Sequence, residues 1–150
     1  MNYFFILFII AMDQVTKYFV HTRFQVNESI PIIKGIFHLT YVRNVGAAFG
    51  ILQNQKMFFI VMTVLVISGI LFFARKQNNM HMLLTYSLSA IIGGAIGNLI
   101  DRMRFGYVVD FFDFRIWPVF NIADISIVVG AGLLAYYMLF IDQSYVEKGR

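Results

Sequence analysis

Hydrophobic residues along the chain fall into four long runs that are separated by polar segments. The runs cover approximately residues 3–20, 57–74, 82–100 and 120–141. A helix needs about 20 consecutive apolar residues to cross the hydrocarbon core of a bilayer. Each run therefore predicts a transmembrane helix, and residues 1–150 as a whole predict a single integral membrane domain.

The segment between the first two runs, residues 21–56, has the composition of β-structure. Its central part, SIPIIKGIFHLTYVRN, is rich in β-branched and aromatic residues, and Gly35 divides it into two strand-like halves. A short polar hairpin at 75–81 joins the second and third runs. The fold class predicted from these patterns is mainly α and integral to the membrane, with four transmembrane helices and a small β-element from the first long loop.

Composition supports this fold class and excludes several functions. The chain is 59% hydrophobic and only 13% charged, whereas about a quarter of the residues in soluble domains are charged. It contains no cysteine, which excludes thiol catalysis, disulfides and cysteine-based metal sites. The net charge of +4 is spread along the loops without a basic run, so nucleic-acid binding has no support. We expect these cations to contact anionic lipid headgroups instead.

Acidic residues are concentrated in one stretch, residues 97–126. This stretch holds four of the eight acidic residues of the chain: Asp101, Asp110, Asp113 and Asp124. Carboxylates in or beside a membrane are energetically costly and usually mark functional sites. Two of them, Asp110 and Asp124, lie inside dense apolar runs (YVVDFF and FNIADISIVV). We predict that these two side chains meet and activate a water molecule.

Other catalytic chemistries find little support in the sequence. The three histidines are scattered and no HExxH motif occurs, which disfavours a zinc site. The VISG sequence at 66–69 lacks the first glycine of a GxSG serine motif. Two adjacent carboxylates, in contrast, can share one proton. The ionised member then acts as general base on water, and the protonated member polarises the scissile carbonyl group.

The two members of this pair are predicted to be unequal. Asn121 is a suitable N-cap for the fourth span, which places Asp124 in the first helical turn, where the helix dipole favours the anion. Asp110 lies among valines and phenylalanines, so burial should raise its pKa. Asp124 is then the base and Asp110 holds the proton. A simpler interpretation of Asp124 is a carboxylate that only completes the helix cap.

The polar residues near the ends of spans one and three also have two interpretations. Asp13 and Lys17 are four residues apart, as in a helix-end ion pair whose lysine extends to the membrane interface. Alternatively, the pair braces the site or contacts a headgroup. Asn98, Asp101 and Arg102 lie within one turn of each other, so Asp101 can be paired internally.

Two further polar positions are open in the same way. Asn44 either belongs to a plain turn before span two or reaches back to the site. Asp113 follows Asp110 by three residues in a segment that favours an extended or irregular course, in which the two side chains point to opposite faces. We therefore expect Asp113 to face solvent or Arg115, and not to be a catalytic residue.

Small residues recur at four-residue spacing in spans three and four. Ser89, Gly93 and Gly97 form one such series, and Ser126 and Gly130 form another. This spacing lets helix backbones approach closely. It indicates helix packing more than catalysis, and it predicts that span four packs against span three.

Five sequence blocks together resemble one known family. The blocks DQVTK, YVRNVGAAFG, GNLIDR, VVDF and FNIAD occur in this order across nearly the whole chain. In this combination the chain resembles the lipoprotein signal peptidases, the type II signal peptidases of bacteria. The resemblance implies a membrane aspartic endopeptidase that needs no cofactor or metal. Such an enzyme removes the signal peptide from prolipoproteins by cleaving just before the lipid-modified cysteine of the lipobox.

The resemblance also implies roles for particular residues. The catalytic pair of the family corresponds here to Asp110 and Asp124. Its supporting, substrate-binding positions correspond to Asp13, Lys17, Asn44, Asn98, Asp101, Arg102 and Asn121.

The location and partners follow from the same resemblance. It implies a bacterial cytoplasmic (inner) membrane protein with both termini in the cytoplasm, the site near the outer face and an extracytoplasmic β-cradle built from residues 21–56. The expected partners are lipid-modified prolipoproteins and membrane lipids, and we expect a monomer. An alternative function from another class is a small proton-coupled carrier that uses the same buried acids as a relay. The chain shows no internal repeat of the kind found in many transporters.

Overall fold

The structure, a computed structural model, describes residues 1–46, 52–77 and 79–142. Its helices are α1 (Tyr3–Arg23), α2 (Lys56–Lys76), α3 (Met82–Phe105) and α4 (Ile122–Tyr136), the last continued by a short π-helix, η2 (Tyr137–Ile141). The described residues contain four helices, one of them α4 with η2, that are long and apolar enough to cross a membrane. The predicted fold class is therefore confirmed.

The predicted boundaries of the spans differ from the observed ones by up to five residues. α1 and α3 continue beyond residues 20 and 100 because helix-compatible polar residues extend their last turns. α3 ends where Gly106 adopts a left-handed conformation (φ 85°), which glycine tolerates without strain. α4 begins only at Ile122, because Asn121 is extended and caps the helix.

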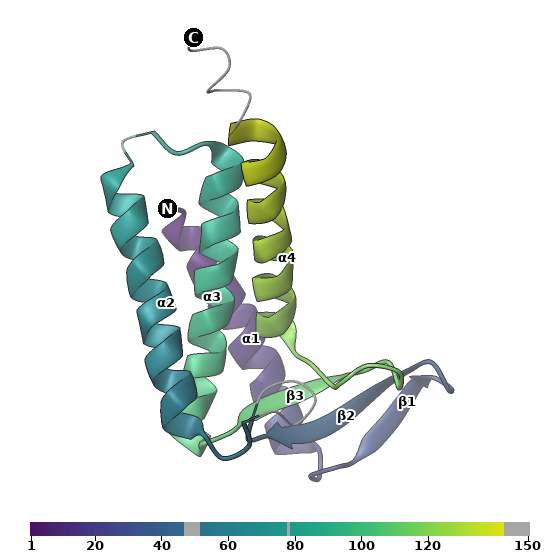
Figure 1. Ribbon diagram of the computed structural model, residues 1–150. Helices are drawn as coiled ribbons and strands as arrows, with labels where there is room; N and C mark the ends of the chain where they lie inside the picture. The colour runs from purple at the N-terminus through teal and green to yellow at the C-terminus, as the bar shows by residue number, and fades with distance from the viewer. Residues whose placement is uncertain (47–51, 78, 143–150) are drawn as a thin grey trace.

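Helix α3 is the centre of the bundle and contacts α1, α2 and α4 (Figure 1). Small residues permit the close approaches. A Cβ atom on Gly130 of α4 would lie 2.8 Å from the carbonyl oxygen of Ser87, and one on Gly93 would lie 3.0 Å from the side chain of Ile9. The predicted packing of span four against span three is confirmed at Gly130, and Gly93 permits the close approach of α1 to α3.

Three strands form an antiparallel sheet in the order β1–β2–β3. They are β1 (Ser29–Ile33), β2 (Phe37–Asn44) and β3 (Val108–Asp113). The first two come from the predicted β-segment, with Gly35 at φ 75° in the turn between them. The third strand comes from the segment between α3 and α4, so the β-element predicted from the first long loop is confirmed for two strands and lacks the third. Apolar residues on β3 are buried on both faces, which explains its recruitment into the sheet.

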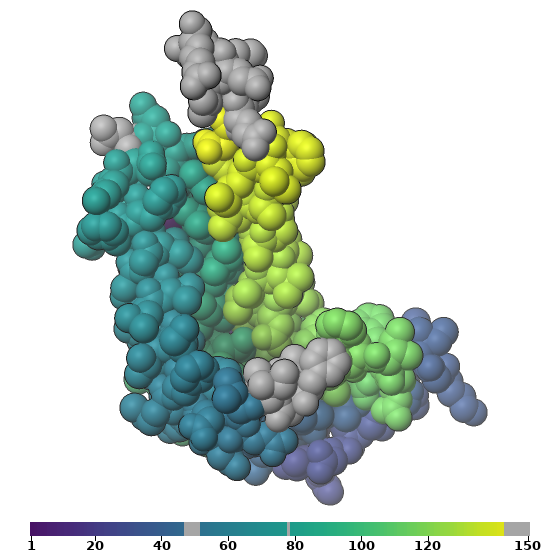
Figure 2. Space-filling model, viewed as in Figure 1, coloured from purple at the N-terminus to yellow at the C-terminus, as the bar shows by residue number. Residues whose placement is uncertain are grey.

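The sheet projects sideways from one end of the bundle, giving an L-shaped molecule (Figures 1 and 2). A buried cluster formed by Val20 of α1, Tyr41 of β2, and Val109 and Phe111 of β3 joins the sheet to the first helix. The other face of β3 is directed toward the junction with α3 and α4, where Asp110 is located.

Candidate active site

Asp124 occupies the first turn of α4 and takes part in a capping box. Its backbone N–H donates to Asn121 Oδ1 at 2.9 Å, and the Asn121 backbone N–H donates to Asp124 Oδ2 at 3.2 Å. The predicted cap is therefore confirmed. The second carboxylate oxygen, Oδ1, accepts a hydrogen bond from Asn98 Nδ2 at 2.8 Å. Asp124 thus completes the cap and also lies open to the cavity described below.

Asp110 is the more deeply buried of the two carboxylates, with a residue exposure of 1%. It accepts hydrogen bonds from Asn121 Nδ2 at 2.6 Å and from Asn44 Nδ2 at 2.9 Å. Burial and the neighbouring charge of Asp124 raise the pKa of Asp110 to about 7, although the bonds from the two asparagines oppose this shift. Near neutral pH this carboxyl group can therefore hold a proton.

One set of side-chain amides links the two carboxylates. Asn121 donates to Asp110 and also to Asn98 Oδ1 at 3.2 Å, and Asn98 in turn donates to Asp124. Because each amide uses its oxygen and its nitrogen, both asparagines are held in one orientation. The pair is therefore positioned by a continuous buried network.

Both carboxylates line the same cavity of about 400 Å³ at the junction of bundle and sheet. Arg102 also lines it, and its guanidinium group donates to the Gly46 carbonyl oxygen at 3.2 Å and stacks 4.6 Å from the ring centre of Phe59. The remaining lining residues are mostly apolar: Asn44, Gly46, Asn98, Val108, Trp117, Pro118, Val119, Phe120, Ile127 and Val128. The cavity can therefore hold a water molecule and an apolar peptide beside two acids.

A second buried cluster supports this site from the side of α1. Lys17 Nζ lies 2.9 Å from Asp13 Oδ2 and 3.1 Å from Asp101 Oδ2, and it donates to Asn98 Oδ1 at 2.9 Å. Lys17 is only 2% exposed, so the interpretation as a lysine extending to the interface is wrong. Asn98 and Asp101 on α3 supply the partners that keep the ammonium group inside.

The same cluster ties four elements together. Asp13 Oδ1 accepts from the Ala123 backbone N–H of α4 at 2.9 Å, and Asp101 Oδ2 accepts from the Val109 N–H of β3 at 3.0 Å. We call Asp13, Lys17 and Asp101 the brace. Asp101 is paired internally, as expected, but with a residue of α1 and not within its own turn.

Asp113 lies away from the cavity and bonds to Arg115. Its Oδ2 accepts from Arg115 Nη1 at 2.9 Å and from Thr40 Oγ1 at 2.7 Å. The predicted pairing is confirmed, but the predicted solvent exposure is wrong, because the residue is 5% exposed. Burial raises the pKa of Asp113, but the bonds from Thr40 and Arg115 outweigh it and hold the pKa below its usual value.

Comparisons with known proteins decide the family. A sequence profile described as "Signal peptidase (SPase) II" matches residues 5–140. The chain belongs to the signal peptidase II family. Among similar proteins, the lipoprotein signal peptidase of Halothermothrix orenii is 57% identical over 138 residues, covering 92% of this chain and 94% of the relative. That of Moorella thermoacetica is 54% identical over 133 residues, with 89% of each chain covered.

Solved structures agree with this assignment to the signal peptidase II family. Two structures described as bacterial membrane enzymes match with TM-scores of 0.86 and 0.84 at 35% and 34% sequence identity. The matches cover 91% of this chain and 85% of the first structure, and 92% of each chain for the second. Family membership implies a protease, and with the four apolar helices it indicates a bacterial inner-membrane protein.

The structure brings together all nine residues that the resemblance to signal peptidases II singled out. They lie in the cavity, in the amide network or in the brace: Asp13, Lys17, Asn44, Asn98, Asp101, Arg102, Asp110, Asn121 and Asp124. Within the described residues, no group of three or more His, Cys, Asp or Glu residues could hold a metal ion. Residues 47–50 of the block YVRNVGAAFG lie outside the described part of the chain.

Sequence reasoning missed one member of this arrangement. Gln14 donates through Nε2 to Asp13 Oδ2 at 3.2 Å, to Asp101 Oδ1 at 3.1 Å and to the Gly97 carbonyl oxygen at 3.2 Å. Its position inside the block DQVTK, directly after a buried acid, was the available signal.

Proposed function

We propose that this chain is a membrane aspartic endopeptidase that removes the signal peptide from prolipoproteins, cleaving before the lipid-modified lipobox cysteine. The observation that carries the proposal is the placement of Asp110 and Asp124 on one cavity, joined by the Asn98–Asn121 network. The names of its relatives supply the substrate class. The paired carboxylates supply the chemistry.

The two carboxyl groups have different surroundings and take different roles. Asp124 accepts two hydrogen bonds at the positive end of a helix dipole, an environment suited to a carboxylate anion. Asp110 has a pKa of about 7 and holds the proton.

Cleavage then proceeds by acid–base chemistry on one water molecule. The water oxygen forms a bond to the scissile carbonyl carbon while Asp124 takes a proton from that water. At the same time Asp110 transfers its proton to the carbonyl oxygen. When the tetrahedral intermediate collapses, the carbon–nitrogen bond breaks and the leaving amine takes the proton from Asp124. Asp110 recovers its proton from the hydroxyl group of the intermediate, so both groups return to their starting states.

The other residues that the resemblance singles out position this pair. Asn44 and Asn121 donate to Asp110. Asn98 donates to Asp124 through Nδ2, and Lys17 fixes the orientation of this amide by donating to its Oδ1. Arg102 places a positive charge at the cavity without forming an ion pair with either acid in the described structure, which suits it to contact the substrate main chain.

Cleavage of a lipid-modified prolipoprotein by the purified protein is the decisive experiment. We expect turnover that survives metal chelators and serine- or cysteine-directed reagents, and that is inhibited by compounds placing a hydroxyl group between the two carboxylates. Loss of activity with a chelator and its return with zinc would overturn the mechanism. Proton-coupled transport without cleavage would favour the alternative carrier function.

The same proposal includes an orientation and an oligomeric state. α1 begins and η2 ends at the end of the bundle opposite the sheet and the cavity (Figure 1). With both termini in the cytoplasm, the site lies at the outer face, where a translocated precursor arrives. All residues of the proposed site belong to one chain, which is consistent with a monomer. Accessibility labelling of single cysteines on each side of intact cells tests the orientation.

A further inference from the structure

The connection between β3 and α4, residues 114–120, exposes large apolar side chains beside the site. Ile116 is 93% exposed and Trp117 is 61% exposed. The segment reads FRIWPVF and contains one charged residue. Contiguous exposed apolar surface of this kind marks a region that a partner or a membrane covers.

The position of this connection indicates that a membrane, and not a partner protein, covers it. It joins directly to α4, whose exposed residues Val128 (70%) and Val129 (52%) belong to a transmembrane helix and face lipid. Figures 1 and 2 show the connection on the side of the sheet that faces the helices, in the inner corner of the L. Its apolar surface therefore continues the lipid-facing surface of the bundle.

The chemistry of the segment fits the boundary between headgroups and acyl chains. Tryptophan favours this boundary, and arginine extends its charged end from it toward water and phosphate groups. The Arg115 side chain is 51% exposed, and the aliphatic Ile116 follows it directly. A cation, an aliphatic side chain and an indole thus occur in consecutive positions.

The fold holds this segment in one conformation. Arg115 has φ 66°, a left-handed conformation that non-glycine residues adopt only when their surroundings impose it. Asp113 imposes it, because its Oδ1 accepts from the Arg115 backbone N–H at 2.8 Å and its Oδ2 accepts from the Arg115 guanidinium at 2.9 Å. Asp113, buried and directed away from the cavity, thus has a role in presenting Ile116 and Trp117.

We propose that Ile116 and Trp117 insert into the lipid leaflet on the side of the active site and anchor the sheet to the membrane. The occupant of this surface is the bilayer and not the substrate, because Ile116, the more exposed of the two, lies outside the cavity that Trp117 helps to line. The inference does not depend on the proposed proteolytic activity.

The chain offers a direct probe, because Trp117 is its single tryptophan. The full-length protein is reconstituted into vesicles of plain phosphatidylcholine or of phosphatidylcholine brominated on the upper part of its acyl chains, without substrate. Because tryptophan at the interface contacts the upper acyl chain, we expect brominated lipid to lower its emission at least about twofold, with little quenching by aqueous iodide. Efficient iodide quenching with no effect of brominated lipid would overturn the proposal.

The substrate is the other conceivable occupant of this surface, and the same quenching measurement distinguishes it from lipid. Asp110→Asn protein with added prolipoprotein is compared with Asp110→Asn protein alone. If iodide quenches Trp117 in the protein without substrate, and added prolipoprotein removes this quenching, the surface binds substrate and the membrane proposal fails. Equal bromolipid quenching in both samples supports the proposal, whether or not the wild-type protein cleaves the substrate.

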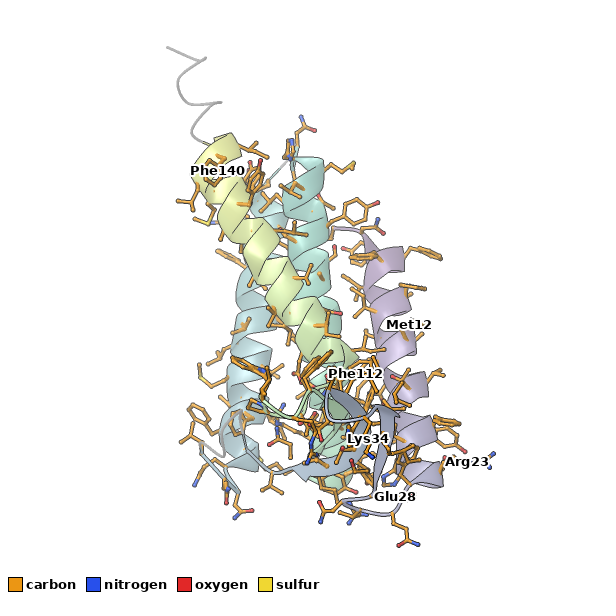
Figure 3. All side chains as sticks on the ribbon, turned by 90° about the vertical axis from the view of Figure 1, so that its right-hand side faces the viewer. Met12, Arg23, Glu28, Lys34, Phe112 and Phe140 are labelled. Carbon is orange, nitrogen blue, oxygen red and sulfur yellow. The ribbon has the colours of Figure 1, made fainter. Side chains whose placement is uncertain are left out.

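A matched pair of variants tests the role of Ile116. Ile116→Asp should shift Trp117 emission to the red and reduce bromolipid quenching, because a carboxylate is costly at this depth. Val26→Asp is the control, since Val26 is also exposed (42%) but lies in the turn before β1. In Figure 3 the nearby Glu28 lies near Arg23 at the lower end of α1, farther down the long axis of the bundle than Phe112. Equal bromolipid quenching in Ile116→Asp and Val26→Asp, both folded by circular dichroism, would exclude Ile116 from the anchor.

Discussion

Two clusters of carboxylates lie side by side in this protein, and they differ in their partners. In the brace, Asp13 and Asp101 both contact the ammonium group of Lys17. In the catalytic pair proposed here, Asp110 and Asp124 are bonded by side-chain amides and a backbone N–H, and within the described residues neither forms an ion pair. The first cluster contains its own counter-ion, whereas in the second Asp110, with a pKa of about 7, can hold a proton near neutral pH.

The comparison teaches how to tell a structural acid from a reactive one in a membrane protein. Asp13, Asp101 and Asp110 are all buried, so burial alone does not separate a brace acid from an acid of the proposed pair. The separating features are the neutralising lysine in the brace, and the shared cavity and amide partners in the proposed catalytic pair. Substitutions in the two clusters should therefore fail in different ways.

The largest effect is expected from removing either acid of the pair. Asp110→Asn and Asp124→Asn should each lower kcat by at least about 10³-fold, because an amide can neither accept nor share the proton. The double variant should lose little more than either single one, since the two groups act as a unit. Prolipoprotein cleavage at matched enzyme concentration measures the loss, and circular dichroism checks that the fold is retained. Substantial turnover by either single variant would exclude the dyad.

Breaking the brace should instead cost stability. Lys17→Met leaves two buried carboxylates without their cation, which is expected to lower the free energy of unfolding by about 3–5 kcal/mol. Thermal or denaturant unfolding in detergent micelles measures this loss. Lys34→Met, at an exposed position in the turn between β1 and β2, is the control and should change stability by less than about 0.5 kcal/mol. Similar stability of the two variants would show that the brace is not structural.

The pH dependence should report the proton held by Asp110. Because its pKa is about 7, compared with an ordinary value of 3.8, activity that requires the protonated form should fall as the pH rises through about 7. The sign for stability is the same: the folded state retains this proton between pH 4 and 7 whereas the unfolded chain releases it. The contribution of Asp110 to stability is thus full below pH 4 and is lost as the pH rises through 7.

Asn44→Ala sharpens this test. The amide of Asn44 donates to the carboxylate of Asp110 and lowers its pKa, so its removal should raise that pKa and move the alkaline limb of the pH–rate profile upward by about one pH unit. The carbonyl stretch of a protonated carboxylic acid in infrared difference spectra follows the same proton directly. A limb that moves to lower pH would contradict the assignment of the proton to Asp110.

The smallest effect is expected at Asp113. In Asp113→Asn the single side-chain oxygen can still accept from Thr40, but the bond from the Arg115 backbone N–H and the charge opposite the Arg115 guanidinium are lost, both of them away from the cavity. We expect less than about a tenfold loss of activity, since an ion pair with a half-exposed arginine contributes at most about 1 kcal/mol. The assay runs beside Asp110→Asn at matched membrane expression. An inactive Asp113→Asn with an active Asp110→Asn would mean that the wrong carboxylate was chosen.

The parts of the fold that follow from local patterns were predictable from the sequence. Apolar run length predicts the four spans, and the N-cap at Asn121 and the turn at Gly35 follow from side-chain chemistry at single positions. The opposite facing of Asp110 and Asp113 follows from the two-residue period of an extended chain.

The long-range partners could not be predicted from local pattern. Recruitment of β3 into the sheet depends on hydrogen bonds to β2, more than 60 residues earlier in the chain. The inward course of Lys17 depends on Asp101 and Asn98, which span one does not contain. An isolated helix with this sequence would extend the lysine to the interface, so the local prediction was reasonable and the tertiary contacts reversed it.

The bond between Asp13 and Ala123 also bears on how the protein is made. The two residues are 110 positions apart. At about 5–20 residues per second, a ribosome needs roughly 5–20 s to synthesise the chain between them. Until α3 supplies Asn98 and Asp101, the first helix has only its own Asp13–Lys17 pair to neutralise these charges in the bilayer, and Asp13 lacks its α4 partner for the whole interval. Its final docking is therefore a late event of biogenesis, and chains that end before α4 should leave the first helix loosely held and open to quality-control proteases.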